Sequence, residues 1–262
     1  MPPPNRITSK NLLLAAIPQE EGLERFFSDL HPVSLSLRQV LHEVGAPLED
    51  VYFIEQGVAS VLTNMADGST IEVGMIGMEG MVGVPALLGG RTSAQRVIVQ
   101  IPGTALCMNA APCKAAFDQS EAVRRVVLRF TEAILNLSAQ TAACNRLHSI
   151  EQRCARWLLM AIDRVQSDEI PLTHEFLSSM LGVRRAGVTN TAGELQSSGL
   201  IRYHRGVLTI VDRDGLEATA CECYRIDHDR LNALLYDRAP ISGSVLSEAY
   251  SRGPEVIPAS RQ

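Results

Sequence analysis

Residues 170–211 limit the fold of this chain more than any other stretch, because two helix signals and a hairpin signal follow one another there. Thr173 can cap a first helix, since its hydroxyl can accept a hydrogen bond from an unpaired backbone N–H. Gly182 can end that helix in the left-handed conformation without a Cβ penalty. The helix between them has one apolar face, made of Phe176, Leu177, Met180 and Leu181.

A second helical segment and a β-hairpin follow this turn. The apolar side of the second helix is expected to consist of Val188, Ala192 and Leu195. The opposite side presents Arg184, Arg185, Thr189, Asn190 and Gln196. Two β-rich runs, 200–203 and 207–211, then flank a turn at 204–206. This order predicts a winged helix-turn-helix, in which the second helix lies in the major groove of DNA.

The charge distribution favours DNA over the alternative, a small packed α/β unit without a nucleic-acid partner. Segment 171–213 contains five Arg and three acidic residues and so carries +2, whereas the whole chain carries −5. Repulsion by the acidic remainder would direct DNA toward this segment.

Two glycines interrupt the second helix, which also has no Ser, Thr, Asp or Asn directly before it. Glycine inside a helix costs about 1 kcal/mol relative to alanine. For Gly187, packing and a close approach of the backbone to DNA explain the residue equally well. For Gly193 we expect a packing role.

The length and composition fit two small domains, with 46% hydrophobic residues over 262 positions. Six cysteines in such a chain do not indicate a disulfide scaffold, and we expect them to be reduced. The apolar run 12–17 is too short for an export signal, and no run has the length of a membrane span. We therefore expect a cytoplasmic protein without membrane contact.

The first half of the chain predicts a barrel. Residues 1–10 form a Pro-rich tail expected to be disordered, and 11–30 have helical spacing. Short β-rich pieces then predict a small antiparallel barrel or jelly roll, at 51–54, 59–63, 70–73 and 96–101, with turns at 55–57, 66–68 and 102–103. Four glycines recur at every third position and are explained better by tight corners than by a phosphate loop: Gly74, Gly77, Gly80 and Gly83.

A long helix is predicted over 118–148, with an apolar stripe at Val123, Val126, Val127, Phe130, Ile134, Leu137 and Thr141. The stripe can pack on the barrel or pair with a second copy. Pairing is favoured, because two recognition helices one helical turn apart match a palindromic site. A further amphipathic helix over 151–165 is expected to pack under the helix-turn-helix.

The last part of the chain carries a helical signal over 216–236 and a Ser/Pro/Gly-punctuated stretch, 237–262, expected to be a mobile tail. Cys221, Cys223 and His228 lie close in sequence, but their spacing matches no zinc motif. The sequence therefore predicts no metal and no cofactor.

Barrel, long helix and winged helix in this order resemble the cyclic-AMP receptor protein/Fnr (Crp/Fnr) family of bacterial transcription regulators. The resemblance is most specific from Thr173 to Arg185, and the barrel adds Val51-Tyr52-Phe53-Ile54-x-x-Gly57 and Gly80-Met81-Val82-Gly83. It implies an α+β chain with a cyclic-nucleotide-binding-like sensor barrel (11–117), a dimerisation helix (118–148), a winged helix-turn-helix (149–213) and a C-terminal helix and tail (214–262). It also implies a homodimer on a palindromic operator, an effector-controlled orientation of the DNA-binding domains, and contact with RNA polymerase.

The sequence departs from the family at the cyclic-nucleotide site. The family's Gly-Glu-Leu element reads Gly83-Val84-Pro85 here, so a ribose hydroxyl would lose its acceptor at a cost of about 1–3 kcal/mol. The phosphate-binding Arg-Ser/Thr-Ala element has no clean match here. Arg91-Thr92-Ser93-Ala94 and Arg96 lie near its expected position, and neither fits it fully. We do not expect cyclic AMP to be the ligand, and the sequence does not say whether an effector exists. The candidate residues of an effector pocket are Gly83, Val84, Pro85, Ser93 and Arg96. An Fnr-type iron–sulfur cluster is not expected, because the first 100 residues contain no cysteine.

The recognition helix also departs from the family, which presents Arg, Glu and a second Arg to the bases. Here the positions hold Arg185, Ala186 and Asn190. Arg185 can bind guanine and Asn190 adenine through paired hydrogen bonds, whereas Ala186 can touch only a thymine methyl. The remaining predicted DNA contacts, mainly to phosphate, are Thr173, Arg184, Thr189, His204 and Arg205.

Two other functions fit the sequence less well than DNA binding. A module that keeps this fold but binds a protein is the runner-up, because a local charge of +2 is modest for a DNA-binding unit. Catalysis has little support, since the chain contains no G-x-S-x-G, P-loop or H-E-x-x-H motif and its histidines are scattered singly. The sequence predicts no catalytic residue, and it specifies neither the effector nor activation versus repression.

Overall fold

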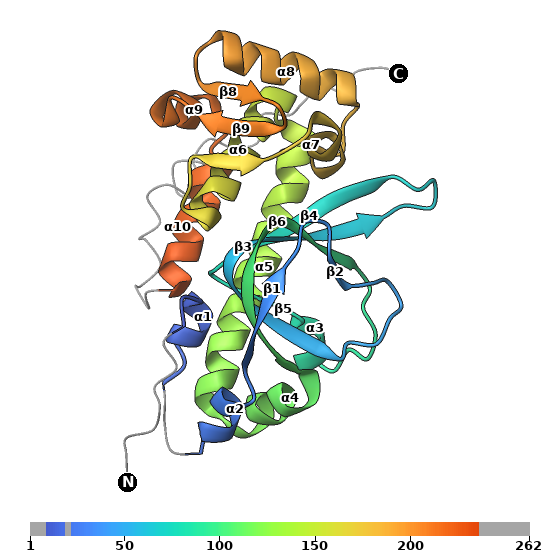
Figure 1. Cartoon of the computed structure of the whole chain (residues 1–262), viewed down its shortest axis with the longest axis vertical. Helices are drawn as coiled ribbons and strands as arrows, with labels where there is room; N and C mark the ends of the chain where they lie inside the picture. The colour runs from blue at the N-terminus through green and yellow to red at the C-terminus, as the bar shows by residue number, and fades with distance from the viewer. Residues whose placement is uncertain (1–8, 19–21, 236–262) are drawn as a thin grey trace, which may run out of the picture.

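The computed structural model describes residues 9–18 and 22–235. A barrel occupies one half of the molecule, a long helix runs along it, and a smaller helical unit lies at the far end of that helix (Figure 1). The tails predicted over 1–10 and 237–262 lie almost entirely outside the described residues. Of the former, Ser9 and Lys10 are described, and the Ser9 hydroxyl and Lys10 N both donate to Glu55 Oε1, at 3.0 and 3.1 Å.

Two short helices precede the barrel, α1 (Leu12–Ala15) and α2 (Glu24–Ser28), where the sequence predicted helical spacing over 11–30. Asn11 caps α1 by accepting from Leu14 N at 2.9 Å, and its amide also donates to Ile54 O and Gly80 O of the barrel. Pro18 follows α1 closely, and proline cannot continue a helix without losing a hydrogen bond. The helical spacing predicted over 11–30 therefore corresponds to two short helices.

The barrel is an antiparallel sheet in the order β1-β6-β3-β4, with β2 beside β6 and β5 beside β3. Its strands are β1 (His31–Leu35), β2 (Val40–His42), β3 (Asp50–Asn64), β4 (Thr70–Ile76), β5 (Met81–Val82) and β6 (Arg96–Asn109). The interior is apolar and includes the fully buried side chains of Phe53, Ile54, Met81 and Met108.

Two turns predicted in the barrel are wrong, because β3 and β6 continue through 55–57 and 102–103. The register shifts at Ile54/Gln56 and Gln56/Val58 instead, as in β-bulges. Gly57 has φ +88°, and a Cβ on Gly103 would overlap the backbone of Gln56. The glycines therefore allow the two paired strands to approach each other closely at the bulges without ending either strand.

The helices that follow are α3 (Val84–Leu87), α4 (Ala110–Gln119), α5 (Glu121–Leu147) and α6 (Ile150–Val165). The long helix predicted over 118–148 is α5, which begins after Ser120 because this side chain accepts from Val123 N at 3.3 Å. Ser149 and Gln152 form a capping box at the start of α6.

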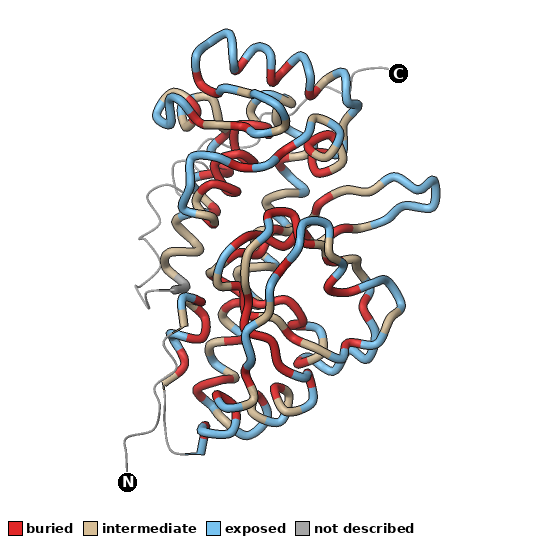
Figure 2. Tube along the Cα trace, in the orientation of Figure 1, coloured by how far each residue is buried: buried red, intermediate tan, exposed pale blue. Residues whose placement is uncertain are grey.

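The apolar stripe of α5 faces the barrel of its own chain, so its assignment to a dimer interface is wrong. Val123, Val127 and Phe130 are buried in the barrel core, and Val126 and Ile134 pack against it (Figure 2). A Cβ on Gly80 would overlap the Phe130 ring, and one on Gly77 would come within 2.7 Å of Arg164 Cβ on α6. Gly77 and Gly80 thus form the expected corner, and because they have no side chains α5 and α6 can pack closely against it.

The unit at the far end contains a small sheet in the order β7-β9-β8 with helices around it. Its elements are β7 (Glu169–Pro171), α7 (His174–Leu181), α8 (Arg185–Ser197), β8 (Ile201–His204), β9 (Val207–Ile210), α9 (Arg213–Thr219) and α10 (Cys223–Leu235). The helix predicted over 216–236 is wrong as a single element, because 220–222 separates α9 from α10.

One apolar core joins this unit to the barrel, and α6 lies in it. Leu158 and Leu159 of α6 share a cluster with Val58 and Met75 of the barrel, and α6 is buried along most of its length (Figure 2). Trp157, predicted to be a core residue, is buried and donates to Glu72 Oε1 at 2.9 Å. Within the described ranges, no helix combines the length and apolar character needed to cross a membrane.

Candidate nucleic-acid interface

Helix α7 is positioned by the two residues that the sequence indicated. The Thr173 hydroxyl accepts from Phe176 N at 3.1 Å, and Gly182 ends the helix with φ +62°. Leu177, Met180 and Leu181 are buried against α6 and α8. Thr173 itself stays exposed at the start of α7, so a phosphate could still reach its hydroxyl.

Helix α8 divides into a buried and an exposed face, as its sequence pattern predicts. The buried face holds Val188, Thr191, Ala192 and Leu195. The exposed face holds Arg184 at the N-cap and then Arg185, Ala186, Thr189 and Asn190. α8 is the outermost helix of the unit, and exposed and buried residues alternate along it (Figures 1 and 2).

His174 organises this surface, a role that its isolated position in the sequence did not show. Its ring lies 4.6 Å from the Tyr203 ring of β8, and Nδ1 lies 3.2 Å from Thr189 Oγ1 of α8. Burial lowers the pKa of His174, and the nearby charge of Arg185 lowers it further. The neutral imidazole therefore links α7, α8 and the hairpin without adding charge.

The β8–β9 hairpin forms a wing beside α8. His204 pairs with Val207, which leaves Arg205 and Gly206 as a two-residue turn with φ +48° and +82°. Two left-handed residues define a type I′ turn, which suits the twist of a hairpin. His204 and Arg205 are exposed at its tip, and the hydroxyl of the neighbouring Tyr203 donates to Leu172 O at 2.8 Å.

Of the two glycines of α8, Gly187 has one of its two expected roles and Gly193 does not have the role expected. A Cβ on Gly187 would lie 3.3 Å from Ile150 Cδ1, so Gly187 packs against the start of α6. A Cβ on Gly193 would meet nothing within 4 Å, and Gly193 is exposed. The packing role predicted for Gly193 is therefore wrong, because the residue follows Thr189 and Asn190 on the open side of the helix.

Two family models match the chain in the regions just described. Residues 32–120 match the cyclic nucleotide-binding domain, and residues 152–219 match the Crp-like helix-turn-helix domain. The chain belongs to the Crp/Fnr family of transcription regulators. The family, the α+β fold and the DNA-binding function predicted from the sequence are thereby confirmed.

Solved Crp/Fnr structures share this fold at low sequence identity. FixK2 from Bradyrhizobium japonicum is 15% identical with a TM-score of 0.63, and the match covers 73% of this chain and 98% of FixK2. A putative crp/fnr regulator from Eubacterium rectale is 19% identical with a TM-score of 0.62, covering 76% and 94%. The c-di-GMP responsive regulator CLP from Xanthomonas campestris is 16% identical with a TM-score of 0.59, covering 72% and 97%. No curated protein sequence matches the chain.

Three of the effector-pocket candidates of this Crp/Fnr regulator lie at the start of α3. Gly83 has φ +109° and approaches Val51 so closely that a Cβ would lie 2.7 Å from Val51 Cγ1. Val84 is buried, whereas Pro85 is exposed. The apolar side chain of Val84 thus occupies the position at which the resemblance to the family implies a hydrogen-bond acceptor for a ribose hydroxyl.

The other two candidates lie on the segment before and within β6. Ser93 is buried, and its hydroxyl donates to Gln95 O at 2.6 Å. Arg96 Nε lies 3.1 Å from Glu43 Oε2. Both polar groups already have partners in their own chain, so an anionic ligand would have to displace Glu43 to reach Arg96.

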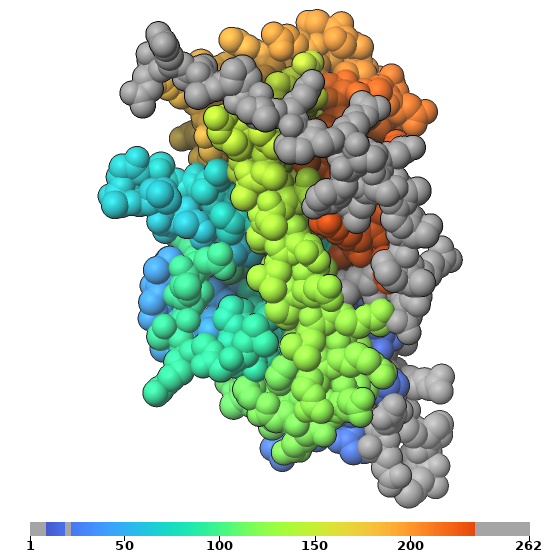
Figure 3. All heavy atoms as spheres, turned by 180° about the vertical axis from the view of Figure 1, so that it is seen from behind, coloured from blue at the N-terminus to red at the C-terminus, as the bar shows by residue number. Residues whose placement is uncertain are grey.

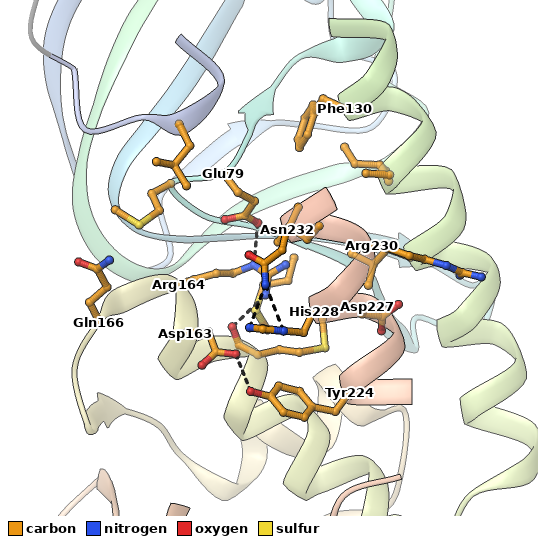
Figure 4. A pocket seen from close by; sticks show the side chains of 18 residues that line it. Glu79, Phe130, Asp163, Arg164, Gln166, Tyr224, Asp227, His228, Arg230 and Asn232 are labelled. Atoms are coloured by element: carbon orange, nitrogen blue, oxygen red, sulfur yellow. Dashed lines mark hydrogen bonds and ion pairs between the residues drawn. The ribbon is translucent and has the colours of Figure 1, made fainter. Parts of the chain in front are cut away.

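A cavity of about 310 Å³ lies elsewhere, where α5, α6 and α10 meet the corner that follows β4 (Figure 4). None of the five candidates lines it. Arg164 Nε donates to Glu79 Oε1 at 2.7 Å on its wall, and the Tyr224 hydroxyl donates to Asp163 Oδ2 at 2.9 Å. Its size lies at the lower end of ligand pockets, which span roughly 300–1,000 Å³.

His228 lines this cavity and contacts Asn232, so it does not join Cys221 and Cys223. Those two cysteines meet Cys144 and His148 instead, both of which the sequence analysis missed. All six cysteines are free thiols.

Proposed function

We propose that this regulator reads a palindromic operator as a homodimer, with Arg185 and Asn190 as its base-contacting residues. The observation that carries the proposal is the outward face of α8. Arg184 and Arg185 have no carboxylate partner within residues 9–18 and 22–235, so their guanidinium donors are available to DNA. Ala186, between Arg185 and the exposed Asn190, would contact a thymine methyl.

The remaining predicted contacts flank this face and position the duplex. Arg184 is the N-cap residue of α8, and Thr189 lies one turn farther along this helix. Thr173 is the N-cap residue of α7, and His204 and Arg205 lie at the tip of the wing. Contacts to phosphate carry no base information, so their loss weakens binding to all sequences alike.

A face of α5 other than the predicted stripe supports a dimer. Leu128 and Leu135 are 45% and 66% exposed, and they are seven residues apart. Ala139 and Ala142 continue this exposed face. Apolar residues repeated every seven positions form the seam of a coiled coil. Figure 3 shows α5 at the molecular surface along most of its length. We assign the seam to a second copy of this chain.

The dimer proposal is tested with Leu135→Glu, which would place two like charges in the seam. We expect a monomer in sedimentation equilibrium and loss of operator binding. Leu88→Glu is the matched control, because Leu88 is 52% exposed and is the C-cap residue of α3 rather than part of α5. A Leu135→Glu variant that sediments as a dimer would contradict the seam.

We also propose that the barrel does not bind cyclic AMP. Val84 supports this, since a buried valine offers no acceptor for a ribose hydroxyl. Addition of cyclic AMP should leave the operator affinity unchanged. We place the regulator in the cytoplasm, in contact with RNA polymerase at promoters, and we assign it no catalytic activity.

The experiment that tests the whole proposal is selection of bound sequences from a random DNA pool, followed by titration of the selected sequence at two salt concentrations. We expect a palindrome with half-sites about one helical turn apart and a steep loss of affinity at higher salt. Enrichment only after addition of a cell extract would identify a required effector. No enrichment under either condition would overturn the proposal in favour of a protein-binding module.

A further inference from the structure

Three thiols and one imidazole meet where the end of α5 approaches the start of α10. Cys144 lies in the last turns of α5 and His148 is its C-cap residue, whereas Cys221 and Cys223 come from the segment that begins α10. One ligand atom from each residue lies within 4.8 Å of all the others. Residues separated by 77 positions in the sequence, Cys144 and Cys221, thus come into direct contact.

Two distances within the group match those around a tetrahedral ion. Cys144 Sγ lies 3.5 Å from Cys221 Sγ, and Cys223 Sγ lies 3.6 Å from His148 Nδ1. With zinc–sulfur bonds of about 2.3 Å and zinc–nitrogen bonds of about 2.0–2.1 Å, neighbouring ligand atoms lie about 3.5–3.8 Å apart. A disulfide would use only two of the four groups. A cubane iron–sulfur cluster would hold the thiolates farther apart, because each binds a different iron.

The surroundings orient the imidazole toward the thiols. His148 Nε2 lies 3.3 Å from Glu222 Oε1. When Nε2 carries the proton and donates to this carboxylate, Nδ1 keeps its lone pair and faces Cys223. A carboxylate that receives the second N–H of a ligating histidine is a regular feature of zinc sites.

The surroundings also favour negative sulfur. Gln140 Nε2 donates to Cys223 Sγ at 3.1 Å. Arg153 and Arg156 of α6 also place their positive charges near Cys144. All three cysteines are buried, with at most 4% of each exposed, so the thiolates would be shielded from water.

We propose that Cys144, His148, Cys221 and Cys223 bind one zinc ion that joins α5 to α10. Four protein ligands leave no open position, so the role is structural. The spacings C-x₃-H and C-x-C come from two distant segments, and neither is a zinc motif by itself. The inference does not depend on the proposed operator recognition.

The first test is the metal content of the full chain, purified without chelators under reducing conditions. We expect one zinc per chain by elemental analysis and its loss in Cys221→Ser. Cys113→Ser is the matched control, because Cys113 is equally buried but lies in α4. Zinc content unchanged in Cys221→Ser, or iron in place of zinc, would overturn the proposal.

A second measurement identifies the ligands. Cobalt should replace zinc and give the visible bands of a tetrahedral ion together with thiolate charge-transfer bands, both absent in Cys144→Ser. After removal of the metal and denaturation, all six cysteines should react with a thiol reagent. Four reactive thiols in metal-free protein would show a disulfide and overturn the zinc site.

A milder variant covers the case in which the serine variants fail to fold. Glu222→Gln should weaken zinc binding about 10–100-fold in competition with a chromogenic chelator, because Glu222 orients His148 without binding the ion. Glu175→Gln, at an exposed carboxylate of α7, should bind zinc like the native chain. Equal affinities in the two variants would contradict the assigned role of His148.

Discussion

Arginines in α6 and arginines at the start of α8 serve opposite purposes within one domain. Arg156 and Arg164 are 6% and 8% exposed, and they pair with Asp227 at 2.6 Å and Glu79 at 2.7 Å. Arg184 and Arg185 are exposed and lack a carboxylate partner throughout the described ranges. The first pair holds α6 to the barrel and α10, and the second pair is available to a molecule from outside.

The difference shows why net charge is a weak indicator of a DNA-binding surface. The +2 of segment 171–213 includes Arg213, yet Arg213 donates to Asp163 at 2.6 Å and to Glu217 at 2.9 Å. A guanidinium that already has two carboxylates contributes little to phosphate binding. The arginines that matter are those whose donors have no partner in the chain.

The largest effect is expected from breaking a buried pair. Arg164→Met should lower the free energy of unfolding by about 3–5 kcal/mol, because it leaves Glu79 buried without its counter-charge. Urea unfolding measures this, and Arg164→Met/Glu79→Leu should recover most of the loss. Arg25→Met is the control, since Arg25 is 90% exposed and should cost well under 1 kcal/mol. If Arg164→Met lowered the free energy of unfolding as little as Arg25→Met does, the paired arginines of α6 would not have the structural role assigned to them.

A buried carboxylate beside α6 should titrate near neutral pH. Burial raises the pKa of Glu72 to about 7, although its bond to Trp157 and the charges of Arg164 and Arg156 oppose this. The folded state therefore binds the Glu72 proton more tightly than the unfolded state does. This proton contributes its full stabilisation below the ordinary carboxyl pKa, and the stabilisation is lost as the pH rises through about 7. Glu72→Gln should therefore be more stable than the native chain at alkaline pH, by about 3 kcal/mol.

The fluorescence of Trp157, the one tryptophan of the chain, measures the ionisation of Glu72 directly. Its emission should change with a midpoint near pH 7 in the native chain and stay flat in Glu72→Gln. The same midpoint in both proteins would assign the change to another group.

The exposed arginines should show the reverse pattern, with binding affected and stability unchanged. Arg185→Ala should cost about 1–3 kcal/mol of operator binding and relax the preference at one base pair. Arg184→Ala should weaken binding to all sequences and reduce the salt dependence. Titration of single-base operator variants separates the two effects, and a uniform loss for Arg185→Ala would make it a phosphate contact.

The smallest effect concerns the exposed glycine of α8. Gly193→Ala should raise the free energy of unfolding by up to about 1 kcal/mol, because alanine favours the helix and its Cβ meets nothing. Operator affinity should fall if the backbone at Gly193 approaches DNA. Gly187→Ala is the comparison, since its Cβ would press on Ile150 and reduce the gain in stability. Unchanged operator affinity in Gly193→Ala would place Gly193 outside the DNA contact.

Local signals in the sequence predicted the helix-turn-helix well. The Thr173 cap, the left-handed Gly182 and the Arg205-Gly206 turn depend on residues within a few positions of each other. The orientation of α5 was not predictable in the same way. A stripe such as Val123, Val127 and Phe130 shows that a face is buried but not whether its own barrel or a second copy covers it.

Contacts between distant segments were predicted least well. Gly57 and Gly103 resemble turn residues in sequence, and only the facing strand shows that they are bulges. The four zinc-ligand candidates lie on segments whose spacing matches no motif, so no local pattern could unite Cys144 with Cys221. His174 was likewise missed, because its partners Thr189 and Tyr203 belong to other elements.

Helix α10 returns from the wing and packs along α5 and α6, with Leu231 and Asn232 reaching the same cavity as Phe130 and Ile134 (Figure 4). The helix-turn-helix unit therefore cannot rotate without sliding or detaching α10. Packed helices exchange between discrete arrangements, and one turn of sliding is about 5.4 Å. The packing of α10 against α5 and α6 thus couples the angle of the DNA-binding unit to the cavity that these helices enclose.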